Sequence, residues 1–167
     1  MTPPRRTPLV RDKVIGVAIV AGVLGLAVAT REHLERVETH RIRDPSDVAA
    51  LAAKLAVLVA TCGTTAFALV RPTGTRAATW VDDLQNWCAE VGRHTGCTLT
   101  TYDPDALRRG IAGNAKHPSN WRLMAELAAR HPAMRMHTRA CLPASMPRYQ
   151  VQKRERYWTP AFLALAA

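Results

Sequence analysis

Two long apolar stretches dominate the hydrophobic pattern of the chain, at residues 14–30 and 48–70. The first holds seventeen consecutive uncharged residues, and the second holds twenty-three residues with the single charge of Lys54. A helix rises about 1.5 Å per residue and a bilayer hydrocarbon core is about 30 Å thick, so a spanning helix needs roughly 17–25 residues. The pattern therefore predicts a transmembrane helical hairpin, joined by the charged link 31–47.

Small residues recur at helical spacing in both stretches. Close backbone approach through small residues is what favours helix pairing in lipid. The predicted packing positions of the hairpin are Ala18, Gly22, Gly25, Ala52, Ala56, Ala60 and Thr64. An alanine-rich composition is the alternative explanation of this spacing. If the packing is real, the same helix faces would also allow a homo-oligomer.

The N-terminal tail, residues 1–13, is rich in proline and basic residues, so we expect it to be disordered. The tail and the first apolar stretch have a second interpretation, a signal peptide cleaved after Ala29, because residues 27–29 have a small-x-small pattern. Lys and Arg are more frequent in the tail and after residue 70 than in the link, which favours cytoplasmic termini. The predicted localisation is the inner membrane, with two passes.

Residues 71–76 contain Pro72 and Gly74 and are predicted to be a linker. A small basic soluble domain is predicted at residues 77–167. Its expected elements are a helix at 77–92, a strand at 97–102, helices at 105–113 and 119–130, and strands at 134–141 and 148–152. The predicted fold is a membrane protein: a two-helix transmembrane hairpin followed by a small α/β or α+β domain.

Helix start signals are clear at three places. Asp44 or Ser46 is predicted to cap a helix that begins near Pro45, since a side-chain oxygen there can accept from the first backbone N–H groups. Asp103 followed by Pro104 is a second start signal, and Ser119 is a third.

The formal net charge is +10, and past residue 70 there are 14 basic and 7 acidic residues. This balance favours an acidic partner: nucleic acid, anionic lipid head groups or an acidic protein. Arg135, His137 and Arg139 alternate in the predicted strand 134–141, so they would share one face. Guanidinium groups bind phosphate oxygens well, which makes these three residues the predicted anion-binding site. A solvated edge strand kept charged against aggregation is the alternative.

The cysteines do not indicate a disulfide framework, although a single Cys88–Cys97 bridge stays open. The pairs His94/Cys97 and His137/Cys141 have ligand-like spacing, and Cys88 and His131 could add to them. Neither pair has the common form of a zinc site, so no metal is predicted. The chain has no phosphate-cradling glycine loop and no catalytic motif, and no cofactor is predicted.

Two functional hypotheses follow. The first is a non-enzymatic, membrane-anchored accessory or adaptor protein, a layout common in bacteria, whose basic domain contacts an acidic partner. The alternative is a membrane-tethered hydrolase or phosphoryl-handling enzyme that uses Arg135, His137 and Arg139 with Asp103, a carboxylate at the end of a predicted strand. The alternative requires these groups to converge in one pocket.

Overall fold

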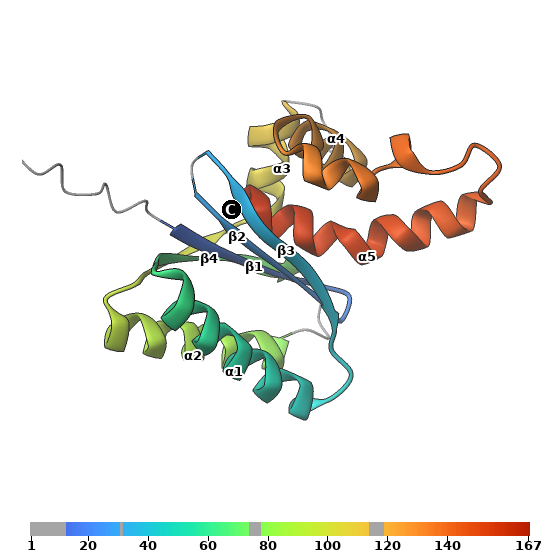
Figure 1. The fold of residues 1–167 in the computed structure, drawn as a ribbon. Coiled ribbons are helices and arrows are strands. Elements are labelled where there is room, and N and C mark those ends of the chain that lie inside the picture. The colour runs from blue at the N-terminus through green and yellow to red at the C-terminus, as the bar shows by residue number, and fades with distance from the viewer. Residues whose placement is uncertain (1–12, 31, 74–77, 114–118) are drawn as a thin grey trace, which may run out of the picture.

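The computed structural model describes residues 13–30, 32–73, 78–113 and 119–167. A five-stranded mixed sheet in the order β3-β2-β1-β4-β5 forms the centre of the molecule. Helices α1 and α2 cover one face of the sheet, and α3, α4 and α5 lie on the other (Figure 1). Each face has its own apolar core.

The first apolar stretch forms two strands, β1 (Lys13–Val20) and β2 (Val23–Ala29), which pair antiparallel. Ala21 and Gly22 make the turn between them, with φ values of 49° and 74°. A two-residue hairpin loop with positive φ at both central residues has a twist that matches the twist of the paired strands. Both strands are buried on both faces of the sheet, so they contain no alternating polar residues.

The second apolar stretch contains a helix and a strand. Helix α1 (Pro45–Cys62) is followed by Gly63 with a φ of 63°, and then by β4 (Thr64–Thr73). Asp44 caps α1 and accepts from the backbone N–H groups of Ser46 and Asp47, which confirms the predicted start. Strand β4 pairs parallel with β1, and the link before α1 supplies β3 (Leu34–Arg41).

The predicted transmembrane hairpin is therefore wrong. Within the ranges that the structure describes, no helix is long and apolar enough to cross a bilayer, so the predicted two-pass inner-membrane localisation has lost its basis. The apolar runs were misinterpreted because strands covered on both faces have the same composition as a membrane span.

The predicted helix-packing positions fall in different elements. Ala18 lies in β1, Gly22 in the turn and Gly25 in β2, while Ala52, Ala56 and Ala60 lie on α1 and Thr64 begins β4. The predicted pairing of two helices from the two apolar stretches therefore does not occur, because the first stretch is a β-hairpin. The tail 1–12 and residues 74–76 of the predicted linker lie outside the described residues.

Most elements of the second half match the prediction. They are α2 (Ala78–Thr95), β5 (Thr98–Tyr102), α3 (Pro104–Ala112) and α4 (Asn120–Arg130). Asp103 caps α3 by accepting from the backbone N–H of Ala106 at 2.8 Å, as predicted. Strand β5 pairs parallel with β4, so the carboxyl ends of β1, β4 and β5 meet at one edge of the sheet.

The two last predicted strands do not exist. Residues 134–141 lie in two short 3-10 helices, η1 (Pro132–His137) and η2 (Arg139–Cys141). Residues 148–152 begin the long helix α5 (Arg148–Ala166). Pro132 and Pro143 bracket the 3-10 segment and favour turns over an extended strand, and the Gln, Lys, Arg and Glu residues of 150–156 favour a helix.

Helix α5 packs against the centre of the sheet through backbone contacts. A Cβ atom on Gly16 would lie 1.7 Å from the carbonyl oxygen of Ala164, and one on Gly25 would lie 2.0 Å from the carbonyl carbon of Pro160. The two glycines therefore let the helix approach β1 and β2 more closely than any other residue would allow. Residues 159–164 of α5 are buried by this contact.

Candidate functional site

The N-terminal half of α5 extends past the part that packs on the sheet and carries a concentration of positive charge. Arg148, Lys153, Arg154 and Arg156 are all exposed, and none of them has an ion-pair partner within the described residues. Glu155 is the single acid of this half, and it accepts from both Nε and Nη2 of Arg139 on η2. Arg41, at the end of β3, adds a fifth exposed cation. We call these five cations the basic surface.

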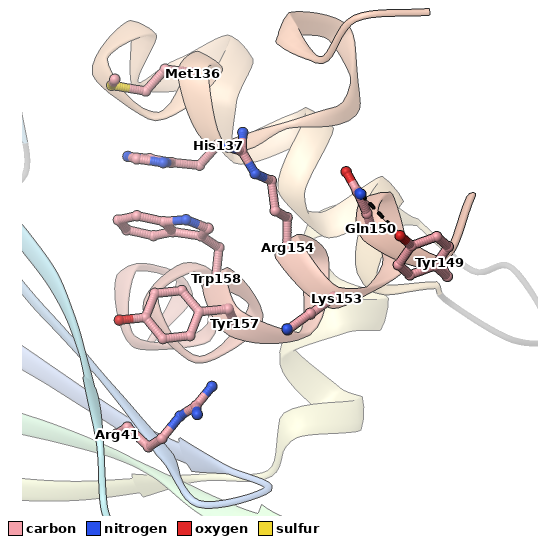
Figure 2. A pocket seen from close by; sticks show the side chains of 9 residues that line it. All are labelled: Arg41, Met136, His137, Tyr149, Gln150, Lys153, Arg154, Tyr157 and Trp158. Atoms are coloured by element: carbon pink, nitrogen blue, oxygen red, sulfur yellow. Dashed lines mark hydrogen bonds between the residues drawn. The ribbon is translucent and has the colours of Figure 1, made fainter. Parts of the chain in front are cut away.

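A hollow of about 740 Å³ opens beside this half of α5 (Figure 2). The helix contributes a mixture of aromatic, amide and cationic side chains, and η1 and β3 complete the wall. The lining residues are Arg41, Met136, His137, Tyr149, Gln150, Lys153, Arg154, Tyr157 and Trp158. No carboxylate is among these lining residues, so an anion that enters the hollow meets no opposing charge from them.

A second hollow, of about 450 Å³, adjoins the first along the same helix half. It shares Arg41, Tyr149, Lys153 and Tyr157 with the first, and it adds Arg156 and the turn between β1 and β2. The two hollows thus meet at the carboxyl end of β1. This is the edge at which α/β sheets commonly bind ligands.

Stacked rings fix the inner wall of the first hollow. The rings of His137 and Trp158 lie 3.4 Å apart at 22°, and Tyr157 meets Trp158 edge-on at 5.9 Å. Figure 2 shows the imidazole lying over the indole. Partial burial and the charge of Arg154 lower the pKa of His137, so the imidazole is neutral at neutral pH. The hydroxyl of Tyr157 donates to the carbonyl of Thr39 at 3.5 Å and so connects α5 to β3.

The three residues of the predicted anion site do not line up on a strand. Arg135 and Arg139 line a separate hollow of about 280 Å³ beside Trp121, whereas His137 lines the large hollow. Arg139 is bound to Glu155, and this hydrogen bond raises the pKa of its guanidinium. The prediction that these three residues share one face of a strand is therefore wrong. Anion binding by them remains a prediction.

Sequence reasoning missed the cations that the structure does bring together. The segment RYQVQKRERYW at residues 148–158 was treated in part as a strand, although it alternates basic and aromatic residues at helical spacing. That spacing was the available signal. Arg41 could not have been found, because only the pairing of β3 with β2 places it near α5.

The structure does not bring together the groups of the hydrolase alternative. Asp103 caps α3 and is not among the lining residues of the hollow that holds His137. Asp105 is paired with Arg108. Asp103 and His137 thus have separate local partners.

The candidate metal ligands of the sequence, cysteines and histidines, lie apart in the structure. The prediction that no metal is bound remains a prediction. In the part of the chain that the structure describes, no three His, Cys, Asp or Glu residues lie where they could share an ion. Burial raises the pKa of the Cys88 thiol to about 12, and Cys97 donates to the carbonyl of Thr64 at 3.0 Å. Cys88 and Cys97 are both free thiols, so the bridge left open above is not formed.

Comparison with known proteins gives a likeness of fold. No protein-family model and no curated protein matches the chain. Among solved structures, RuvC of Thermus thermophilus aligns with a TM-score of 0.57 at 17% identity, over 92% of this chain and 95% of that one. The same protein in complex with a Holliday junction substrate gives 0.54. The yeast mitochondrial Holliday junction resolvase Ydc2 gives 0.58 at 11% identity, over 93% of this chain and 78% of that one.

These likenesses show a shared fold: the chain has the fold of the two RuvC structures and of Ydc2. The hypothesis of a membrane-anchored adaptor is wrong, because its membrane helices are a β-hairpin and a helix–strand unit of that fold.

Proposed function

We propose that this chain binds nucleic acid through the basic surface of α5 and Arg41. The observation that carries the proposal is the set of five exposed cations, which have no acidic partner within the described residues. Arg41, Lys153, Arg154 and Arg156 line two hollows at the carboxyl end of β1, and Arg148 lies at the start of the same helix. Cations that neutralise phosphates and release condensed counterions supply most non-specific affinity for nucleic acid. Two proteins of the same fold support this class of partner: RuvC, solved in complex with a Holliday junction substrate, and Ydc2, named a Holliday junction resolvase.

The proposal is limited to binding. Nucleases that use two metal ions hold them with carboxylates close to the scissile phosphate. At the centre of the sheet the paired residues Ala18 and Val70 are apolar and buried against α5, and no group of three ligating side chains lies together in the described ranges. The residues present at this place do not fit such a pair of ions.

The test is a salt series of binding to a fluorescent four-way DNA junction, measured by anisotropy. For four to five phosphate contacts, the slope of log K against log salt should be about −4. The double variant Lys153→Ala/Arg156→Ala should reduce the magnitude of the slope by about 2, because two phosphate contacts are lost. No binding at low salt would contradict the proposal.

Arg93→Ala is the matched control. Arg93 is exposed near the end of α2, on the opposite face of the sheet. Its replacement removes one charge of the same sign but should leave the slope unchanged. If removing Arg93 reduced the salt slope as much as removing one cation of α5, net charge and not the basic surface would govern binding.

A further inference from the structure

We infer that the hollow beside α5 accepts unpaired nucleotides of a nucleic-acid strand, with bases against its aromatic side chains and phosphates against its cations. This inference rests on the proposed function and specifies its substrate. It starts from the order of side chains along the helix. Residues four apart lie on the same side of a helix, about 6 Å apart along its axis.

Two such stripes run along the exposed half of α5. The first is Tyr149, Lys153 and Tyr157, and all three line both hollows. The second is Gln150, Arg154 and Trp158, and all three line the large hollow. Each stripe places a cation one helical turn from an aromatic ring. A single strand presents the matching pattern, a phosphate beside each exposed base.

The rings offer accessible stacking surface. Tyr149 is 67% exposed and lines the hollow, and Figure 2 shows its ring far along the helix from the His137–Trp158 stack. Its hydroxyl accepts from Nε2 of Gln150 at 3.0 Å, which holds the ring beside the amide. The His137–Trp158 stack closes the inner end. Because the imidazole is neutral at neutral pH, it adds a flat surface without adding charge.

A base pair in a duplex has both faces covered by its neighbours, so the tyrosines gain nothing from it. Unpaired bases have free faces, and stacking on an aromatic side chain stabilises the complex by about 1–3 kcal/mol per base, for any base. The cations attract both forms of nucleic acid. The aromatic residues therefore determine the preference for single-stranded over duplex nucleic acid, and the cations determine the affinity for both.

The volume agrees with this occupant. About 740 Å³ is within the range of roughly 300–1,000 Å³ that is usual for pockets that bind compact ligands. The lining residues also include the amide of Gln150 and the hydroxyl of Tyr149, which can form hydrogen bonds with the edges of a base.

The experiment compares a 20-nucleotide oligo-dT strand with a 20-base-pair duplex for the full chain, by anisotropy at one salt concentration. The single strand should bind more tightly, and Tyr149→Ala should weaken its binding by about 5- to 150-fold while duplex binding changes less than twofold. Tyr149→Phe keeps the ring and should retain the preference. The salt slope should be the same in all three proteins, since no cation is changed.

Trp121→Ala is the matched control, because Trp121 is 50% exposed but lies on α4 beside a different hollow. It should change neither affinity. Equal binding of strand and duplex, or no effect of Tyr149→Ala, would overturn the inference and leave the proposed function standing. Binding of free dTMP without binding of the strand would also overturn it. Failure of strand, duplex and junction alike would overturn both proposals.

Discussion

The two halves of helix α5 have the same backbone geometry and opposite environments. Residues 159–164 include Phe162 and Leu163, which are fully buried, and they lie on the glycines of β1 and β2. Residues 148–158 carry the cations and aromatic rings that border the hollows. One half covers the face of the sheet, and the other carries the basic surface. Stability and binding should therefore respond to substitutions in different parts of a single helix.

The largest expected effect is a loss of folding at the glycine contact. Gly16→Ala places a methyl group where the Ala164 carbonyl oxygen lies, so α5 must move off the sheet. We expect a loss of at least about 3 kcal/mol in the free energy of unfolding, since overpacking against backbone cannot be relieved by a rotamer change. Urea unfolding followed by circular dichroism measures it.

Gly110→Ala is the control for this change. Gly110 lies within α3, has no atom within 4 Å of its would-be Cβ, and has no positive φ. Alanine there should leave stability unchanged or raise it by about 1 kcal/mol, because glycine is the weaker helix former. A similar loss at both glycines would mean that the close approach of α5 is not what Gly16 is needed for.

The second prediction compares side chains from the two halves directly. Phe162→Ala leaves a cavity in the core of the α4/α5 face and should cost about 3–5 kcal/mol. Lys153→Ala, nine positions earlier in the same helix, should change stability by no more than about 0.5 kcal/mol. Thermal unfolding of the two variants measures the contrast. A comparable cost at Lys153 would show that the exposed half also carries the fold.

A smaller effect is expected at the ion pair that connects η2 to α5. Glu155→Gln removes the carboxylate that holds Arg139, so the guanidinium becomes available to phosphate. The salt slope of nucleic-acid binding should become steeper by about 1. Stability should change by less than about 1 kcal/mol, because half of the Arg139 side chain is exposed. An unchanged slope would place Arg139 outside the bound surface.

The smallest effect concerns pH. The pKa of His137 is below its usual value in the folded chain, through burial and through Arg154. The unfolded chain therefore binds more protons near pH 6, and stability should decrease as pH falls below about 6.5. The decrease between pH 7.5 and 5.5 should be smaller in His137→Gln, measured as the urea midpoint. The pKa of His131 is also lowered, so part of the decrease in the urea midpoint should remain in His137→Gln.

The elements with local signals were predictable from the sequence. The caps Asp44 and Asp103 and the helices α2, α3 and α4 follow from start residues and from a 3.6-residue periodicity. The central strands were not, because burial on both faces removes the alternation that identifies a strand. What distinguishes them from membrane helices is their partners, such as Ala164 above Gly16, and those partners lie far away in the sequence.

For the candidate site, the sequence predicted the positive charge but not the residues that carry it in the structure. Composition predicted a basic surface and an acidic partner, and the pattern placed the binding cations at 135–139, whereas the structure gathers five exposed cations on 148–156 and Arg41. In residues 134–141, which lie between Pro132 and Pro143, basic and apolar residues alternate as in a strand although the segment forms 3-10 helices. In residues 148–158, aromatic rings and cations recur at the i, i+4 spacing of a helix. The contribution of Arg41 depends on sheet pairing, which no local pattern encodes.

The contact between Gly16 and Ala164 has a consequence for how the chain reaches its native state. It joins the first strand to the last helix, so it closes one of the longest loops the chain can make. Such contacts form late and slow the reaction, because the entropy of the loop is lost before the contact is gained. Until α5 arrives, Ala18, Ala27 and Val70 have no cover on their side of the sheet. During that interval the chain is open to self-association, and synthesis at high concentration should yield aggregates that slower expression avoids.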